Sequence, residues 1–419
     1  MMKKVVAILL IMIMVFSLAG CANDAVKKDA EKTEPVAKEK VELTLLGWGG
    51  AEEEKIVNGY LSEFQKENPN IKVTFVRPAD YWPKLKTMIA GGTAPDAFYM
   101  GFPEFVEFQK QDVLLNLSEF AVDFDENDFQ EGQLNAFRDP NSGDLYGVPK
   151  DWSSYVMYYN KAMFDEAGLP TPNEMYENGN WTYDTFESTA KKLTTAEHHG
   201  AAINYGRWKA FVPQTGANWV DKDSRKVTVN TPEFAKGIQY LADLGNKSKV
   251  IPTVDELADL SPADRFSNKK AAMFMSGRWM AMRFAELDFE WDIAPMPSDV
   301  TESTWIDLVA YCGSSDTKYP EETWKLINFL TGKKIEEQVA KAGQAIPARI
   351  SVANSPAFLE SIDVNNKAHL EIEANPIPVF DHWGEVWDAL NRNLELVWTG
   401  EDTAVNAAKA AQEEIDGIK

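Results

Sequence analysis

The amino-acid sequence predicts an α/β protein with two sizeable domains. In its N-terminal part, short apolar strands alternate with amphipathic helices in the order strand, helix, strand, helix, strand, with short connections. This order indicates a mostly parallel sheet. The chain has 419 residues, and removal of a leader of 20 would leave 399, which is enough for two hydrophobic cores.

The first 20 residues have the features of a secretory signal. A basic start, MMKK, is followed by an uncharged apolar run from Val5 to Phe16 and by Leu18-Ala19-Gly20-Cys21. The apolar run is shorter than a typical transmembrane span. Leu-Ala-Gly-Cys resembles the bacterial lipobox, which implies cleavage before Cys21 and a diacylglycerol thioether on its sulfur. The alternative is an ordinary signal in which Cys21 is incidental.

Residues 21–40 are expected to be a lipidated tether. After Cys21 they are mainly Lys, Glu, Asp and Ala, with one Pro and almost no large apolar residue. Such a composition favours a solvated chain over a folded one. Two acyl chains anchor a protein stably where one is marginal. The sequence therefore predicts a protein held at the outer face of a bacterial membrane through Cys21 alone.

Charge and cysteine content exclude several classes of function. The net charge of −23 argues against a nucleic-acid surface, which needs clustered Lys and Arg, and against broad contact with anionic lipid. Cys21 and Cys312 are the two cysteines, so a lipidated Cys21 leaves no intrachain disulfide, and Cys312 is expected to be a small buried residue. His198 and His199 are adjacent but lack zinc-site spacing, and we expect them at the surface or in a loop. We expect no metal and no cofactor.

The N-terminal elements follow from apolar periodicity. They are a strand at 41–45, a helix whose buried stripe is Ile56, Tyr60 and Phe64 with Val57 and Leu61, a strand at 71–76, a helix near 83–90 and a strand at 97–100. Trp48 lies just past the first strand and Asp80 just past the second. Ligands collect at the carboxyl ends of parallel strands, so both residues are expected near a ligand site.

The segment from 143 to 161 is expected to lie at the centre of the molecule. Short runs at 145–148 and 155–159 are rich in Val and Tyr and predict two strands. Pro149 should end the first strand, because it cannot donate a ladder hydrogen bond. The residues between the two runs are Lys150, Asp151 and Trp152. They form either a polar hairpin loop or a crossing between two domains, with side chains facing the gap.

Further elements are expected along the rest of the chain. Asn160 should cap a helix at 161–167, which Gly168 ends. Strands are expected at 271–275, 291–294 and 306–311, and a helix at 333–342. Two C-terminal helices should bury apolar stripes, one with Val386, Leu390, Leu394 and Val397, the other with Val405, Ala408 and Ile415.

A series of segments carries a family resemblance. In order they read NPNIKVTFV, YWPKLKTMIAGGTAPDAFYM, LLNLSEF, GDLYGVPKDWSSYVMYYNKAMFDEAGL, WTYDTFESTAKKLT, KKAAMFMSGRW, DIAPMPSD and TWKLINFLTGKKIEEQVAKAGQAIP. From about Val41 to the C terminus, the chain resembles the sugar-type extracellular solute-binding proteins of bacterial ABC importers, the group that includes maltose-binding protein.

The resemblance implies a type II periplasmic-binding-protein-like fold, in which two α/β lobes are joined by three crossings. The candidate crossings are Pro149–Trp152, Pro295–Thr304 and Gly343–Pro347. Lobe one would then be residues 41–149 plus 305–345, and lobe two 150–304 plus 346–419. The resemblance also implies ligand-driven closure of the lobes. The expected partners are a carbohydrate and membrane permease subunits, and the protein is expected to be a monomer.

The 13 Trp residues are the basis for the expected ligand. Several lie in turn-like contexts, namely Trp48, Trp152, Trp208, Trp219, Trp279, Trp305 and Trp383. A saccharide offers C–H faces to aromatic rings and hydroxyls to planar polar groups. The expected ligand-binding residues are Trp48, Asp80 and Tyr81 from lobe one, Asp151 and Trp152 at the crossing, and Trp208, Trp219, Arg278, Trp279 and Trp383 from lobe two. The resemblance supports Trp279 and Trp383 in particular, as sugar-stacking rings. Expected core positions are Trp181, Trp291, Trp324, Trp387 and Trp398.

Alternatives stay open for single residues and for the function. Trp48 could be packing in a lid, Asp151 a hydrogen-bond acceptor at a hinge, and Arg278 a partner of a carboxylate in its own lobe. A glycan-active enzyme needs two carboxylates flanking one bond, and Asp80 with Asp151 is the one pair available. Because no catalytic motif is present, we expect no enzyme. The same fold could also bind a peptide, a polyamine or a metal chelate, or serve a sensor instead of an importer.

Overall fold

The computed structural model describes residues 39–122, 124–221, 224–371, 380 and 382–418, and the backbone of 374–375. The predicted signal peptide, Cys21 and nearly all of the predicted tether lie outside these residues. Among the described residues, no helix combines the length and the apolarity needed to cross a bilayer.

The first sheet contains the predicted N-terminal elements. Its strand order is β10-β4-β9-β3-β1-β2, and β11 pairs with β9. The strands are β1 (Val41–Leu46), β2 (Ile71–Val76), β3 (Ala97–Gly101), β4 (Gly147–Ser154), β9 (Thr304–Gly313), β10 (Ile346–Pro347) and β11 (Ala374–Asn375). β1 pairs in parallel with β2 and β3, whereas β9 runs antiparallel to β3 and β4. The β-α-β-α-β order therefore produces the parallel part of the sheet, as predicted.

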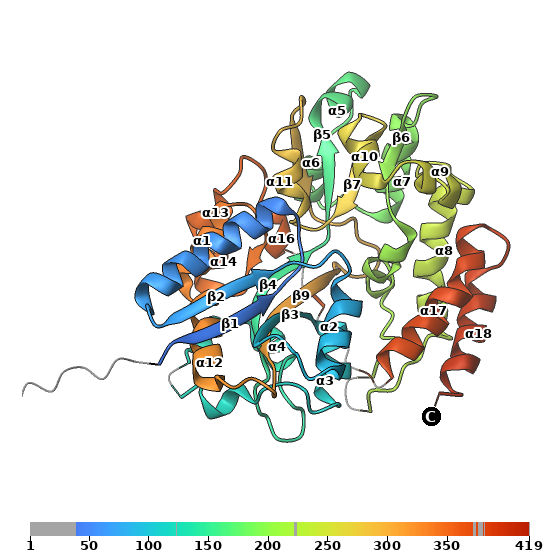
Figure 1. The fold of residues 1–419 in the computed structure, drawn as a ribbon. Helices are drawn as coiled ribbons and strands as arrows, with labels where there is room; N and C mark the ends of the chain where they lie inside the picture. Colours follow the sequence, from blue (N-terminus) through green and yellow to red (C-terminus); the bar gives the residue numbers. More distant parts are fainter. Residues whose placement is uncertain are drawn as a thin grey trace, which may run out of the picture. The chain divides into compact units, whose positions relative to one another are not determined.

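Helices from two separate parts of the chain, residues 51–135 and 320–359, pack around this sheet. They are α1 (Ala51–Glu67), α2 (Tyr81–Ala90), α3 (Phe102–Gln109), α4 (Glu131–Asn135), α12 (Pro320–Leu330), α13 (Lys333–Lys341), α14 (Ile350–Ala353) and α15 (Pro356–Leu359). α1 lies along β2 (Figure 1). Its buried residues are Val57, Tyr60, Leu61 and Phe64, which confirms most of the predicted stripe, while Ile56 is half-buried.

The second sheet has the strand order β6-β7-β5-β8. Its strands are β5 (Val156–Asn160), β6 (His199–Ala202), β7 (Ala271–Ser276) and β8 (Trp291–Ala294). The helices that follow these strands are α5 (Lys161–Ala167), α6 (Pro172–Glu177), α7 (Tyr183–Leu193), α8 (Pro232–Asn246), α9 (Val254–Asp259), α10 (Pro262–Ser267) and α11 (Met280–Phe284). Asn160 caps α5 through the backbone N–H of Met163, and Gly168 ends it with φ of 63°. Both predictions are confirmed.

Pro149 does not end a strand, contrary to the prediction. β4 continues through Lys150, Asp151 and Trp152, so these residues are not a hairpin loop. The ladder with β9 shifts register between Pro149 and Asp151, and β10 pairs with β4 only at Asp151 and Trp152. Pro149 lies opposite Ala310 directly before this shift, so its missing N–H coincides with an irregularity of the ladder with β9, and β10 does not pair with it. The chain leaves the first sheet after Ser154 and enters the second at Val156.

The C-terminal helices α17 (Trp383–Trp398) and α18 (Ala404–Ile415) lie side by side next to α8 (Figure 1). Val386, Leu390, Leu394 and Val397 are buried in α17, as predicted. The stripe predicted for α18 is wrong at Val405, which is 63% exposed. The buried residues of α18 are Ala404, Ala407, Ala408, Ala411 and Ile415. Val405 follows Ala404 directly, and a step of one residue turns a side chain about 100° away from the buried face.

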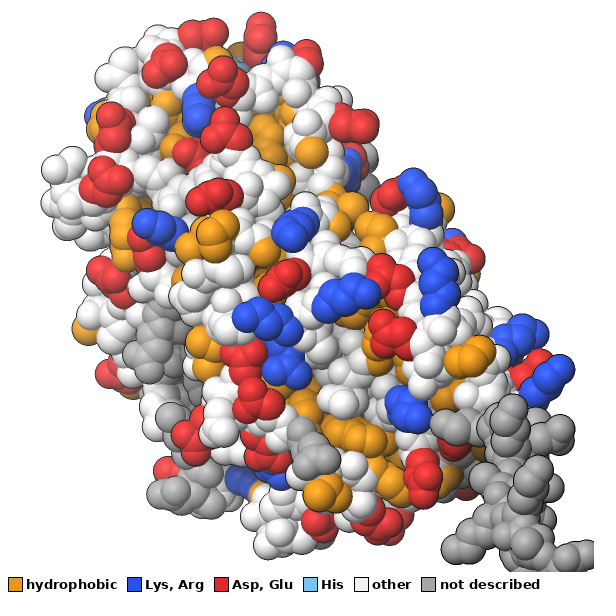
Figure 2. Space-filling view, turned by 90° about the vertical axis from the view of Figure 1, so that its left-hand side faces the viewer, with side chains coloured by type: hydrophobic (Ala, Val, Ile, Leu, Met, Phe, Trp, Pro, Cys, Tyr) orange, Lys and Arg blue, Asp and Glu red, His pale blue; other side chains and the backbone are white. Residues whose placement is uncertain are grey.

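The surface that carries α1 and α13 shows acidic and basic side chains interspersed, without an extended patch of one sign (Figure 2). Exposed ion pairs such as Lys72–Glu42 at 3.4 Å and Lys55–Glu52 at 3.3 Å belong to the helices and strands at this sheet edge. Pairs of this exposure contribute little to stability. The boundaries of the two predicted lobes stay predictions.

Candidate functional site

Strands β4 and β9 present one polar face. Asp307, Val309 and Tyr311 alternate along β9 and so point to the same side of the sheet. On β4, Ser153 lies opposite Asp307 and Asp151 lies opposite Val309. Directly opposite residues of an antiparallel pair share a face. Four residue steps from Asp307 to Tyr311 make this face about 13 Å long. We call it the β4–β9 face.

Asp307 is the centre of a dense polar cluster. Its Oδ2 accepts a hydrogen bond from the Tyr155 hydroxyl at 2.8 Å, and its Oδ1 accepts one from the Trp305 indole N–H at 3.2 Å. Two cations of the 3-10 helix η3 (Tyr205–Ala210) approach the same carboxylate, Arg207 at 3.5 Å and Lys209 at 3.7 Å. The Asp307 side chain is still 35% exposed. It can therefore accept further hydrogen bonds from solvent or from a ligand.

Aromatic rings surround the two cations. The Arg207 guanidinium lies 4.7 Å from the Tyr155 ring centre and 5.5 Å from that of Trp279. The Lys209 ammonium lies 4.7 Å from the Trp305 ring centre and 5.3 Å from that of Trp387. Trp279 is 37% exposed, which is unusual for so large a ring. The cluster thus combines fixed charges with an open aromatic surface.

A row of stacked rings continues from this cluster. Trp208 stacks on Trp387 with ring centres 5.5 Å apart, and Trp387 stacks on Trp383 at the same distance with planes 9° apart. Phe380 stacks on Trp383 at 4.4 Å. Trp383 and Trp387 are half-buried, so the row is accessible at these two rings. Trp387, predicted to be a core residue, therefore lies only partly in the core.

A second charged cluster occupies the other end of the β4–β9 face. The Lys150 ammonium pairs with Asp151, lies 3.8 Å from Glu53, and sits 4.8 Å from the Tyr99 ring centre. Gln344 donates to Glu53 at 2.6 Å. Burial by itself lowers the pKa of Lys150, but the two carboxylates outweigh burial and leave the pKa raised. Lys150 is therefore a cation at any physiological pH.

Trp48 lies in a ring cluster at the carboxyl end of β1. Its ring makes edge-on contacts with Tyr81 at 4.9 Å and with Tyr99 at 5.3 Å, and it lies 5.6 Å from Trp82. Tyr81 is buried and its hydroxyl donates to the Tyr99 carbonyl. Trp48 is half-buried and Asp80 is exposed. Of the predicted residues of this region, Trp48 and Asp80 are thus accessible, and Tyr81 packs behind Trp48.

Trp152 points away from the site that the sequence predicts for it. It lies opposite Leu308 in the β4–β9 ladder, on the other face from Asp151 and Asp307. Its ring is buried, and its indole N–H donates to the Pro347 carbonyl at 3.0 Å. The side chain therefore joins β4 to β10, and a ligand cannot contact its buried ring in this structure.

Trp208 and Trp219 are also buried, at 1% and 4% exposure. Their rings contact each other at 5.7 Å and both pack on Phe234 of α8. Trp305, which the sequence places in a turn-like context, is buried in β9 as well. These rings form the support behind the accessible row and do not reach solvent.

Arg278 is fully buried and has a structural environment. Its guanidinium donates to Asn366 at 2.8 Å and to Ser361 at 2.7 Å, so its partners are an amide and a hydroxyl and not the carboxylate considered from the sequence. Burial lowers the pKa of Arg278 to about 10. Its backbone N–H donates to Ser153 at 2.6 Å. Arg278 thus ties the turn after β7 to the β4–β9 face.

The neighbouring Gly277 explains how Trp279 is held. The Tyr158 hydroxyl donates to the Gly277 carbonyl at 2.8 Å. A Cβ atom at Gly277 would lie 2.1 Å from a Trp279 ring carbon and 2.6 Å from the Ser153 hydroxyl oxygen. Because Gly277 has no side chain, the indole can lie over the glycine, and it contacts Tyr155 with ring centres 6.1 Å apart. Trp279 therefore lies beside Arg207 and Tyr155 of the Asp307 cluster, and its role in binding a ligand stays a prediction.

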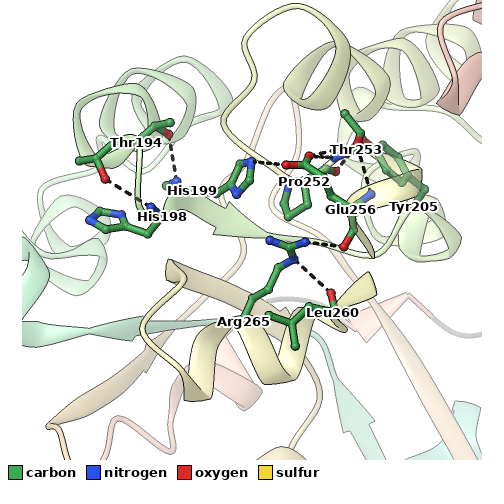
Figure 3. A network of polar contacts seen from close by, with 11 residues as sticks. Thr194, His198, His199, Tyr205, Pro252, Thr253, Glu256, Leu260 and Arg265 are labelled. Atoms are coloured by element: carbon green, nitrogen blue, oxygen red, sulfur yellow. Dashed lines mark hydrogen bonds and ion pairs between the residues drawn. The ribbon is translucent and has the colours of Figure 1, made fainter. Parts of the chain in front are cut away.

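The His198–His199 pair belongs to a separate network (Figure 3). His198 lies in the loop before β6, as predicted, but His199 is the first residue of β6 and lies 3.7 Å from Glu256. Burial lowers the pKa of His199. Glu256 completes the capping box of α9 with Thr253, and Arg265 of α10 donates to the Leu260 carbonyl at 3.1 Å. The network joins α9 and α10 to β6. Within the described part of the chain, no group of three or more potential metal ligands occurs.

Residues 59–371 match the family described as bacterial extracellular solute-binding protein. The chain belongs to this family. The predicted family is thus confirmed, and the solute-binding protein acts outside the cytoplasm. Its relatives include a galactooligosaccharide-binding protein of Bacillus subtilis, which is 23% identical over 432 residues, covering 100% of this chain and 97% of that protein.

Two further comparisons are informative. The sn-glycerol-3-phosphate-binding periplasmic protein of Pectobacterium atrosepticum is 23% identical over 396 residues, covering 86% of this chain and 87% of that protein. An ABC substrate-binding protein from Listeria monocytogenes, solved in complex with cycloalternan, superposes with a TM-score of 0.81 and 29% identity, covering 91% of this chain and 100% of that chain. The predicted two-lobe α/β fold class is confirmed by this likeness.

Sequence reasoning missed several residues of the solute-binding protein's candidate site. They are Glu53, Arg207, Lys209, Asp307 and Trp387, together with Tyr155, which is fully buried behind Asp307. One signal was available for Asp307, because it is the one acidic residue in the apolar strand TWIDLVAYCG. Arg207 and Lys209 flank the buried Trp208, but nothing local shows that they reach a strand 100 residues later.

Glu104 of α3 provides a pH-dependent prediction. Burial raises the pKa of this carboxyl to about 7, against the opposing effect of Lys86 and Lys209. The folded chain therefore binds this proton more tightly than the unfolded chain does. The contribution of Glu104 to stability is complete below pH 4.5 and is lost as the pH rises to about 7. Glu104→Gln removes the charge that burial disfavours, so we expect it to raise the free energy of unfolding at pH 8 by about 1–3 kcal/mol. The lower part of this range applies if solvent reaches the half-buried side chain and screens the charge.

Urea unfolding at pH 5 and at pH 8 measures this effect. The matched control is Glu107→Gln on the exposed side of the same helix, which should change stability by less than about 0.5 kcal/mol at either pH. An equal effect of Glu104→Gln at both pH values would contradict the assigned pKa.

Proposed function

We propose that the protein captures a carbohydrate, most simply an oligosaccharide, and delivers it to the permease subunits of an ABC importer. The observation that carries the proposal lies at the Asp307 end of the β4–β9 face, where the exposed indole of Trp279 and the Asp307 carboxylate, which still has acceptor capacity, share Arg207 and Tyr155 as neighbours. A saccharide needs both, since its C–H faces pack on rings and its hydroxyls donate to carboxylates. The relatives named for oligosaccharides support the same ligand class.

The proposed site revises the set of residues expected from the sequence. It keeps the accessible residues Trp48, Asp80, Asp151, Trp279 and Trp383, and adds Glu53, Lys150, Arg207, Lys209, Asp307 and Trp387, with the fully buried Tyr155 behind Asp307. Tyr81, Trp152, Trp208, Trp219 and Arg278 are assigned to support behind these residues. Since micromolar binding requires about −8 kcal/mol and one aromatic contact adds about 0.5–1.5 kcal/mol, several rings have to contribute together.

Closure of two lobes around the ligand is part of the proposal. Lobe one would be residues 41–149 plus 305–345, and lobe two 150–304 plus 346–419. Closing adds rings to the ligand and removes water, which strengthens each hydrogen bond inside. Small-angle scattering with a saturating ligand should show compaction, and unchanged dimensions would refute closure.

Anchoring through Cys21 is also proposed, on the basis of the lipobox-like Leu18-Ala19-Gly20-Cys21. Diacylation of Cys21 after removal of residues 1–20 would hold a monomer at the outer face of the cell membrane by the tether 21–40. Cys21→Ser should release the protein from the membrane fraction. Release of the wild-type protein to the same extent would refute the anchor.

The experiment that tests the ligand class is a thermal-shift panel of neutral oligosaccharides, peptides, polyamines and metal chelates, with calorimetry on each hit. Stabilisation by an oligosaccharide alone supports the proposal, and stabilisation by a peptide or polyamine instead refutes it. New reducing ends after incubation with the bound oligosaccharide would indicate a glycan-active enzyme, for which Asp80 and Asp151 are the one carboxylate pair expected from the sequence.

A further inference from the structure

The three cations described at the candidate site, Lys150 of β4 and Arg207 and Lys209 of η3, are each paired with a carboxylate. Arg207 and Lys209 share Asp307, at 3.5 and 3.7 Å. Lys150 lies between Asp151 and Glu53, with 3.8 Å to the latter. The site therefore holds three cations and three anions at fixed positions, and none of these three cations is left free for an anionic ligand.

The carboxylates are fixed more firmly than a simple ion pair would require. Asp307 accepts hydrogen bonds from Tyr155 and Trp305 in addition to its two cations. Glu53 accepts from Gln344 at 2.6 Å and from Tyr99 at 3.4 Å. Because neutral donors hold them too, these carboxylates cannot swing away when a competing anion arrives without leaving buried donors unpaired.

The cations are likewise fixed, because each one also lies against aromatic rings. Lys209 contacts the rings of Trp305 and Trp387, and Lys150 contacts that of Tyr99. The Lys150 and Lys209 side chains are both only 15% exposed. An anion would have to approach them past a carboxylate of the same sign within a few ångströms, which is a repulsive arrangement in a partly buried site.

We propose that this site selects uncharged saccharides and rejects ligands that carry a phosphate or a carboxylate. The inference rests on the proposed function. Asp307 is the main specificity-determining residue, since Arg207 and Lys209 both pair with it, while Asp151 and Glu53 both pair with Lys150, so that the charges of the six side chains sum to zero. These carboxylates accept hydrogen bonds from the hydroxyl groups of a neutral sugar, and they repel a ligand that carries a negative charge. The net charge of −23 adds long-range repulsion of anions.

The test is a gain of anion binding in Asp307→Asn. Calorimetric titration with glycerol 3-phosphate and with inorganic phosphate should give binding at least 10-fold tighter in this variant than in the wild-type protein, because Arg207 and Lys209 lose their shared carboxylate. The gained binding should weaken as salt is raised. The matched control is Asp299→Asn, which frees Lys236 from an ion pair elsewhere and should bind neither probe.

A second variant shows whether the gain uses these cations. Adding Arg207→Gln to Asp307→Asn should remove most of the gained affinity. Should Asp307→Asn fail to fold, Glu53→Gln with Asp151→Asn makes the same test at Lys150. Tight phosphate binding by the wild-type protein, or no gain in either carboxylate variant, would overturn the inference. Failure of all neutral oligosaccharides to bind would instead refute the proposed function, so the two failures are distinguishable.

Discussion

Replacing Trp279 with Ala should weaken oligosaccharide binding by about 10- to 100-fold while leaving the thermal unfolding midpoint nearly unchanged. The ring is 37% exposed, so its removal opens no cavity in the core. Its expected loss in binding free energy is about 1.4–2.7 kcal/mol, which combines lost ring contact with lost apolar burial. Trp279→Phe should retain most of the affinity, since a smaller ring still covers Gly277 and faces Tyr155.

Calorimetric titration with the best ligand of the panel measures this effect. The matched control is Trp324→Ala on α12, whose ring packs edge-on against Phe124 with ring centres 5.6 Å apart. That variant should show the opposite pattern, a lower unfolding midpoint with unchanged affinity. If Trp279→Ala unfolds early and still binds normally, Trp279 is a packing residue and not a ligand contact.

Gly200→Ala should lower the free energy of unfolding by about 3 kcal/mol or more. Gly200 lies in β6 against α7, and a Cβ atom there would be 2.1 Å from the Ala190 carbonyl oxygen and 2.6 Å from its carbonyl carbon. Both are backbone atoms of a helix, so no side-chain rotation relieves the overlap, and β6 has to separate from α7. Losses of this size are typical only of such severe packing defects.

Urea denaturation followed by circular dichroism checks this result. Gly59→Ala provides the control, because Gly59 is exposed on α1 and a Cβ atom there meets nothing within 4 Å. That variant should gain about 0.5–1 kcal/mol, since glycine in a helix loses more entropy on folding than alanine does. A Gly200→Ala protein as stable as the wild type would mean that β6 and α7 are packed less closely than the structure has them.

Local patterns were sufficient for much of the fold. Alternation in Val41–Leu46, the stripe of α1, the Asn160 cap and the Gly168 stop all depend on neighbours a few residues away, and the structure has each where it was predicted. The family, too, was evident from the order of short segments. Each of these features requires only chain-local geometry, in which periods of 2 and 3.6 residues decide which side chains share a face.

The sequence alone thus determined the α/β class, the family and most strand and helix positions. Tertiary structure decided which aromatic residues meet solvent. Trp152, Trp208 and Trp279 all lie in segments rich in polar neighbours, yet a register shift in β4 buries the first, packing on α8 buries the second, and a glycine leaves the third exposed. Asp307 gathers Tyr155, Arg207 and Lys209 from positions 98 to 152 residues away. Such contacts depend on how two sheets and their helices pack, which no local period encodes.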